Sequence, residues 1–266
     1  MFMNDHDSGM FKAMNKDSPF AKFYRNLPSQ FPNQPKAIVI ISAHWEEPYF
    51  TVNCHQGLPV PLLYDYSGFP QNLYAPYFLY AAVSNKELED RIFNLLVDEF
   101  GENDVRKSAS PRGFDHGVFI PLKVMYPEPN VPIVQVSLTK DLDFSKHYRL
   151  GRSLSSLLND NIVIIGSGQT THNLRGIGDV SLNASAIRYS QWLSDTLNED
   201  PQSAQNMHPR TEHIIPLLVA FGAAYPTIDK EECYKQYKQK VKKIYSEIVL
   251  ETLSLDSYLL NEMSTE

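Results

Sequence analysis

Cysteine is scarce in this chain. Only two of its 266 residues, Cys54 and Cys233, are cysteines. Two thiols are too few for a disulfide framework, so we expect a protein of a reducing compartment, the cytoplasm. No apolar stretch approaches the roughly 20 residues that cross a bilayer, so we expect no membrane partner. The N-terminus lacks a basic segment followed by an apolar one, which argues against a secretory signal.

Positive charge is also in short supply. Lys and Arg number 24 against 31 Asp and Glu, for a formal net charge of −7. Without a basic run or stripe, nucleic acid is not an expected partner. Hydrophobic residues make up 42% of the chain, which is typical of a soluble globular protein. Because no internal repeat or low-complexity linker interrupts the chain, we expect one domain over residues 1–266, as a monomer or homodimer.

Apolar, β-branched runs alternate with helical patterns along the chain. Buried strands are predicted over residues 36–42, 131–138 and 161–165. A capping box, Ser84 to Glu87, predicts the start of a helix. Further helices are predicted over residues 144–158, 183–197 and 209–224, the last with Pro209 at its first position. This alternation predicts the α/β class, with a mixed central sheet flanked by helices.

The C-terminal part is less regular. The charged run over residues 229–243 is interpreted as a solvated helix or an insertion, and residues 249–260 as a closing strand pair.

Two of the eight histidines follow predicted buried strands. His44 comes after the strand that ends in Ile40-Ile41-Ser42-Ala43, and His172 comes after the strand at 161–165 and a run of small residues. Strand ends aim side chains into the crevice where α/β sheets bind ligands. A hydrogen-bonded core histidine is the simpler interpretation of either one alone. Two in matching positions favour a metal or an acid/base function.

Three other histidines have contexts of interest. His116 lies between Asp115 and Gly117 on a predicted turn, where an acid/base group or a plain turn fits equally well. His213 lies on the first turn of the predicted helix at 209–224, and His6 lies close to the N-terminus. Imidazole-rich sites suit zinc, iron, copper or nickel. The residues alone therefore predict a histidine-rich metal site and leave the reaction open.

Several motifs occur together in a recognisable order. They are Ser42-Ala43-His44-Trp45-Glu46, Gly68-Phe69-Pro70, Gly113-Phe114-Asp115-His116-Gly117, Ser167-Gly168 with His172-Asn173-Leu174-Arg175, Glu212-His213 with Pro216-Leu217-Leu218, and Thr252 to Tyr258. In this order they resemble the class III extradiol ring-cleaving dioxygenases, in the branch similar to DOPA 4,5-dioxygenases. The resemblance covers nearly the whole chain.

The resemblance implies a single α/β catalytic domain with one metal ion per chain, Fe(II) or Zn(II). It implies metal ligation by His6, His44, His172 and His213, with His213 either a ligand or a close neighbour of one. It also implies that His116 is the acid/base residue facing the substrate and that His172 takes part in proton transfer. The expected substrates are a catechol, a DOPA-like or related aromatic diol, and O2, and Tyr66 with Gly68-Phe69-Pro70 is expected to form an aromatic wall for the ring.

Two alternatives remain beside the dioxygenase. A zinc-dependent hydrolase of the same architecture is compatible with a ligand set dominated by histidine. A non-catalytic protein that binds a metal or a small molecule is compatible with the turn at His6, where Asp7 stands at a position at which the family usually has glycine.

Overall fold

The computed structural model describes residues 15–75, 79–172, 177–199, 211–226, 241–249 and 253–260. Two compact units divide the chain. The first comprises the described residues up to Asp141 together with Ser156–Ser167, and the second comprises Leu142–Ser155 with the described residues from Gly168 onward. The single domain over residues 1–266 stays a prediction. None of the described helices is long and apolar enough to cross a bilayer.

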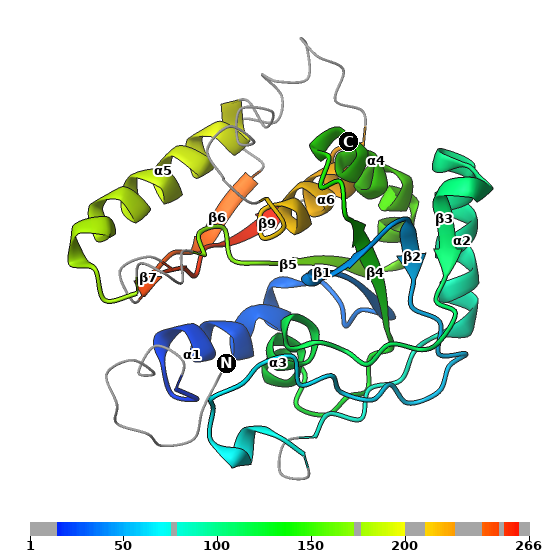
Figure 1. Cartoon of the computed structure of the whole chain (residues 1–266), viewed down its shortest axis with the longest axis horizontal. Coiled ribbons are helices and arrows are strands. Elements are labelled where there is room, and N and C mark those ends of the chain that lie inside the picture. The colour runs from blue at the N-terminus through cyan, green and yellow to red at the C-terminus, as the bar shows by residue number, and fades with distance from the viewer. Residues whose placement is uncertain are drawn as a thin grey trace. The chain divides into compact units, whose positions relative to one another are not determined.

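A five-stranded mixed sheet forms the centre of the first unit, in the order β3-β2-β4-β1-β5 (Figure 1). Its strands are β1 (Ala37–Glu47), β2 (Phe50–Val52), β3 (Val105–Lys107), β4 (Ile133–Thr139) and β5 (Ile162–Ser167). β1 pairs in parallel with both β4 and β5, whereas β2 runs antiparallel to β4. Every residue of β4 is buried, including the polar Gln135, Ser137 and Thr139, as in a strand that is covered on both faces.

The central strand β1 is irregular where the histidine motif lies. Ile41 pairs with Val136 of β4, but the next pair is Glu46 with Leu138, so β1 carries extra residues between these two points. Such bulges re-aim side chains and occur often beside active sites. The sequence placed His44 after the end of this strand, and that boundary is wrong, because β1 continues through His44 to Glu47.

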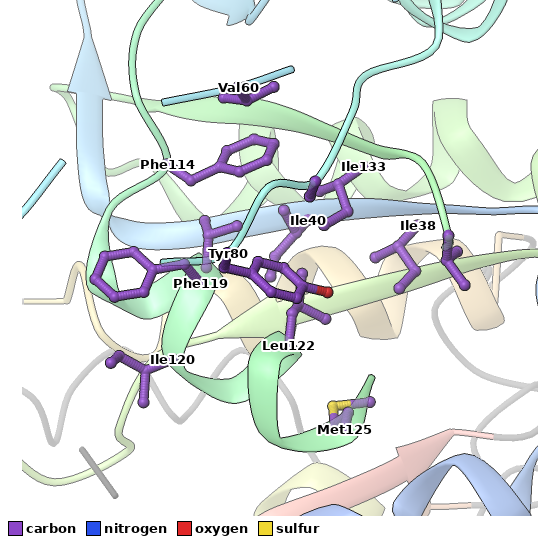
Figure 2. Packing of buried hydrophobic residues seen from close by; sticks show 13 residues of the cluster. Ile38, Ile40, Val60, Tyr80, Phe114, Phe119, Ile120, Leu122, Met125 and Ile133 are labelled. Carbon is purple, nitrogen blue, oxygen red and sulfur yellow. The ribbon is translucent and has the colours of Figure 1, made fainter. Parts of the chain in front are cut away.

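Three helices cover the sheet of the first unit: α1 (Pro19–Asn26), α2 (Lys86–Phe100) and α3 (His116–Met125). α3 packs on β1 and α1 packs on α3, while α2 lies against β2 and β3 (Figure 1). Figure 2 shows the core under α3, where Phe119 and Leu122 pack with Ile40 of β1. Short 3-10 turns connect these elements at Leu27–Gln30, Gln71–Leu73 and Glu102–Asp104.

The start of α2 differs from the sequence prediction by one residue. Its N-cap is Asn85, whose side chain accepts a hydrogen bond from the Leu88 N–H at 2.9 Å. Ser84, the expected cap, instead accepts a bond from the Gly57 N–H at 2.9 Å. Asn and Ser are comparable capping residues, so the tertiary partner of Ser84 decides between them.

The second unit contains α4 (Phe144–Leu154), α5 (Asn183–Glu199), α6 (Ile215–Ala224), β6 (Val241–Tyr245), β7 (Ile248–Val249), β8 (Leu253–Ser254) and β9 (Ser257–Leu260). Two 3-10 turns, Ser155–Asp160 after α4 and Val180–Leu182 before α5, complete the described elements.

α4 and α6 cross at two glycines. A Cβ at Gly151 would lie 2.0 Å from the Val219 carbonyl oxygen, and one at Gly222 would lie 2.2 Å from that of Tyr148. Only glycine permits this approach of two backbones.

The second unit differs from the sequence prediction in the start of one helix and in the pairing of its C-terminal strands. α6 begins at Ile215, and residues 211–214 before it form a turn. Pro209, the expected first helical residue, lies outside the described residues. In the C-terminal part β7 pairs with β8 and β9 pairs with β6, so β9 takes its partner from the charged run. The α/β class, with a mixed central sheet flanked by helices, is confirmed.

Candidate active site

Hydrogen bonds hold both the backbone N–H and the backbone carbonyl of His44. Its N–H donates to the Ser42 hydroxyl at 3.2 Å, and its carbonyl accepts from Nη2 of Arg112 at 3.0 Å. These contacts lie where the register of β1 against β4 shifts. The side chains of Ser42 and Arg112 therefore hold the backbone of His44 at the bulge.

The buried carboxylate of Asp115 anchors both of those side chains. Oδ1 accepts the Ser42 hydroxyl at 2.7 Å, and Oδ2 accepts Arg112 Nη1 and Gln135 Nε2, each at 2.8 Å. The Asp115 side chain is 0% exposed, so its charge depends on these donors and on the Arg112 cation. Asp115 thus supports the backbone of His44 through Ser42 and Arg112.

His116 is the first residue of α3 and directly follows Asp115. Gly117 behind it has almost no room: a Cβ there would lie 2.5 Å from Ser42 Oγ, 3.1 Å from Asp115 Oδ1 and 3.3 Å from His44 Cδ2. The glycine lets the start of α3 approach the bulge of β1. This approach brings the His44 and His116 rings within 4.1 Å of each other, measured between centroids.

A proline inside α3 frees a backbone carbonyl near His116 for a contact with the sheet. Pro121 has no N–H, so the carbonyl of Gly117, four residues earlier, lacks its usual helical partner. The hydroxyl of Ser167, at the end of β5, donates to that carbonyl at 2.6 Å. The start of α3 is thereby tied to β5 as well as to β1.

Asp65 joins the two histidines. Its Oδ1 lies 2.8 Å from Nδ1 of His116 and its Oδ2 lies 3.5 Å from Nδ1 of His44. One ligand atom from each of these three residues lies within 4.8 Å of the others, and among the described residues this is the one such group that could hold a metal ion. Burial raises the pKa of the Asp65 carboxyl, but hydrogen bonds and charge from His116 outweigh it, so the pKa lies below its ordinary value.

Aromatic side chains surround His116. The Tyr66 ring stands edge-on to it, with centroids 5.7 Å apart, and Tyr66 also contacts Phe69 and Phe119. The Tyr66 hydroxyl donates to the Leu73 carbonyl, and burial raises the pKa of this phenol. Tyr66 therefore offers an aromatic surface, not an ionised oxygen, beside His116.

The second unit brings together another pair of predicted histidines. The rings of His172 and His213 stack with centroids 4.1 Å apart. His213 is buried just before α6, not on its first turn, and its Nδ1 accepts the Gln169 N–H at 3.2 Å. A Cβ on Gly168 would lie 2.4 Å from the His213 carbonyl oxygen, so glycine is needed there.

Four of the predicted histidines therefore occur in two pairs, one in each unit: His44 with His116, and His172 with His213. His6 lies outside the described residues. Sequence reasoning missed Asp65. Its only local signal is its place between two tyrosines, just before the Gly68-Phe69-Pro70 motif.

The fold and the site together define an α/β protein with a candidate metal centre beside the bulged central strand of its first unit. The family model for the catalytic LigB subunit of aromatic ring-opening dioxygenase matches residues 6–245, and the chain belongs to this family. The resemblance inferred from the motifs is confirmed. The protein is an enzyme of the extradiol, aromatic-ring-opening type, as predicted.

Individual relatives agree with the family. The chain is 37% identical to a 4,5-DOPA dioxygenase extradiol of Beta vulgaris over 84% of this chain and 86% of that protein. It is 35% identical to one of Mirabilis jalapa, over 72% of this chain and 74% of the other. The crystal structure of an uncharacterized protein of Escherichia coli K12 is similar with a TM-score of 0.66 and 24% identity, covering 91% of this chain and 93% of that one, which supports the fold alone.

Proposed function

We propose that this enzyme opens the ring of a catechol by extradiol cleavage with O2 and depends on one metal ion per chain, Fe(II) or Zn(II). The observation that carries the proposal is the group formed by His44, Asp65 and His116 at the bulge of β1. The names of the relatives support a DOPA-like substrate. A catechol and O2 are then the small-molecule partners, and the cytoplasm is the proposed location.

The donor chemistry of this group fits a divalent metal. Imidazole is a ligand type that both iron and zinc accept, and in this group His44 offers one imidazole beside the acid/base candidate His116. We assign His44 as a ligand, because the bulge and its supporting side chains hold it rigidly. The wider ligand set of His6, His44, His172 and His213 stays a prediction.

His116 is proposed as the acid/base residue. An imidazole near neutral pH can take a proton from a catechol hydroxyl and return it later in the reaction. A bound metal would supply Lewis acidity that eases this deprotonation. His172 stays a predicted participant in proton transfer.

The aromatic residues beside His116 suit a ring-shaped substrate. Tyr66 and Phe69 are packed edge to face, and Tyr66 also contacts Tyr74. Aromatic pairs prefer such offset or edge-on arrangements, and a catechol ring can join them in the same way. The fixed Tyr66 hydroxyl keeps this wall apolar toward the site.

Oxygen consumption by protein reconstituted anaerobically with Fe(II) tests the proposal. L-DOPA and a panel of simpler catechols are the substrates, and absorbance is followed for a coloured ring-opened product. We expect oxygen uptake that depends on both catechol and metal. Background uptake from protein that demonstrably holds iron would contradict it, and hydrolysis of esters or amides by zinc-loaded protein, indifferent to oxygen, would favour the hydrolase instead.

A further inference from the structure

Asp65 reaches the site from a loop that precedes His116 by 51 residues. Its Oδ1 accepts the backbone N–H of His116 at 2.9 Å and lies 2.8 Å from Nδ1 of the same residue. Its Oδ2 faces Nδ1 of His44 at 3.5 Å. A single carboxylate is thus placed against the rings of both His44 and His116.

We propose that Asp65 is a positioning residue, which holds the His116 ring in the tautomer with hydrogen on Nδ1 and leaves Nε2 as the basic nitrogen. This inference rests on the proposed function and deepens it. A neutral imidazole has one N–H, so a ring that donates from Nδ1 carries its lone pair on Nε2. The same carboxylate places negative charge beside His44, as carboxylates commonly do behind metal-binding histidines.

The ionised carboxylate of Asp65 decides the direction of its hydrogen bond to the His116 ring. A backbone N–H can only donate, so Oδ1 of Asp65 acts as an acceptor at this point whatever the state of the ring. An ionised carboxylate can only accept, and Nδ1 of His116 must then donate to it. Because Oδ1 is engaged by both N–H groups of His116, we assign Asp65 to orienting the rings and not to binding the metal.

The loop that carries Asp65 is fixed by the residues that directly precede it. Before it, the Leu63 N–H donates to the Phe114 carbonyl at 2.7 Å and the Phe114 N–H donates to the Pro61 carbonyl at 2.9 Å. Around it, Tyr64 packs edge-on against Phe119 of α3, with centroids 5.6 Å apart. The side chain of Asp115, the N-cap of α3, makes no capping bond, so Asp65 also supplies an acceptor and a negative charge at this helix start.

The tautomer can be observed without turnover. ¹⁵N chemical shifts of the imidazole nitrogens distinguish a protonated from an unprotonated nitrogen. They are recorded on the metal-free full chain at about pH 8.5, about two pH units above the ordinary pKa of a free imidazole. We expect Nδ1–H and a bare Nε2 at His116 in the wild type. In Asp65→Asn, whose amide is a weaker acceptor, we expect a shift of population toward Nε2–H. Asp98→Asn, an exposed carboxylate on α2, is the matched control and should match the wild type.

Metal content and steady-state kinetics complete the test. Asp65→Asn should keep the wild-type metal stoichiometry and lose roughly 10- to 100-fold in kcat. KM should change little, since the lost interaction acts on proton transfer.

Three outcomes would overturn the inference: Nε2–H as the main tautomer in the wild type, unchanged His116 shifts in Asp65→Asn, or loss of metal from Asp65→Asn, which would make Asp65 a ligand. The wild-type spectrum alone decides the first, so the test does not depend on the folding of the variant. If no catechol supports oxygen uptake, the proposed function fails while the tautomer result still stands.

Discussion

At the scale of single residues, the proposed function divides two tasks between neighbouring imidazoles, metal binding by His44 and proton transfer by His116. His44 is held through its backbone by Ser42 and Arg112, whereas His116 is held through its ring by Asp65. A metal ligand needs a fixed position, and an acid/base residue needs a defined nitrogen for the proton. Removing each ring should therefore have different consequences.

His44→Ala should lose the metal, because a ligand is removed. His116→Ala should keep the metal but lose roughly 10²- to 10⁴-fold in rate, the range for an acid/base group. Metal analysis of the purified variants and oxygen uptake by iron-loaded samples measure the two effects. Equal loss of metal from both variants would show that the roles are assigned wrongly.

At the scale of elements, the start of α3 is joined to two neighbouring strands of the sheet, β1 and β5, through side chains. The bulge of β1 and the start of α3 share the carboxylate of Asp115, and the end of β5 reaches α3 through Ser167. The missing N–H of Pro121 and the missing Cβ of Gly117 make this junction possible. The bulge of β1 and the irregular start of α3 thus bring His44 and His116 together.

Asp115→Ala should destabilise the protein by roughly 3 kcal/mol, because it removes the carboxylate that pairs with the partly buried Arg112 cation and that accepts hydrogen bonds from Ser42 and Gln135. Urea unfolding followed by circular dichroism measures the change. Asp160→Ala is the control, since it breaks an exposed ion pair with Arg91 and should cost less than about 1 kcal/mol. Similar costs for the two variants would contradict the anchoring role of Asp115.

At the scale of the whole molecule, the chain has the fold and family of an aromatic ring-opening dioxygenase, with one pair of predicted site histidines in each of its compact units. Because a metal binds the native state and not the unfolded chain, its affinity adds directly to stability.

Anaerobic addition of Fe(II) or Zn(II) should stabilise the full chain by about 2.7 kcal/mol at a free metal concentration of about 100 times the Kd. For a chain of this size that is an increase of roughly 5 to 10 °C in Tm. Differential scanning calorimetry measures the shift. Asp98→Asn should retain it and His44→Ala should lose it; the same shift in His44→Ala would show that the metal binds elsewhere.

The sequence by itself determined the class of fold and the family. Apolar, β-branched runs favour strands, so β1, β4 and β5 were predictable from local composition. The expected burial holds for β4, whereas β5 is only half-buried after Ile162. The histidine motifs were also visible, because each is a short run of consecutive residues. Helix starts were approximately right, yet the cap of α2 and the beginning of α6 were displaced, since local signals allow several neighbouring starts.

Only the tertiary structure decided how the site is assembled. The bulge at His44 depends on the register between β1 and β4, which no local pattern specifies. Asp65 meets His116 across 51 residues of sequence, and Ser42 meets Asp115 across 73. Hydrogen bonds between such distant residues form only after the sheet and α3 have packed, which is why the sequence showed the histidines but not the contacts of Asp65 and Asp115 that hold them in place.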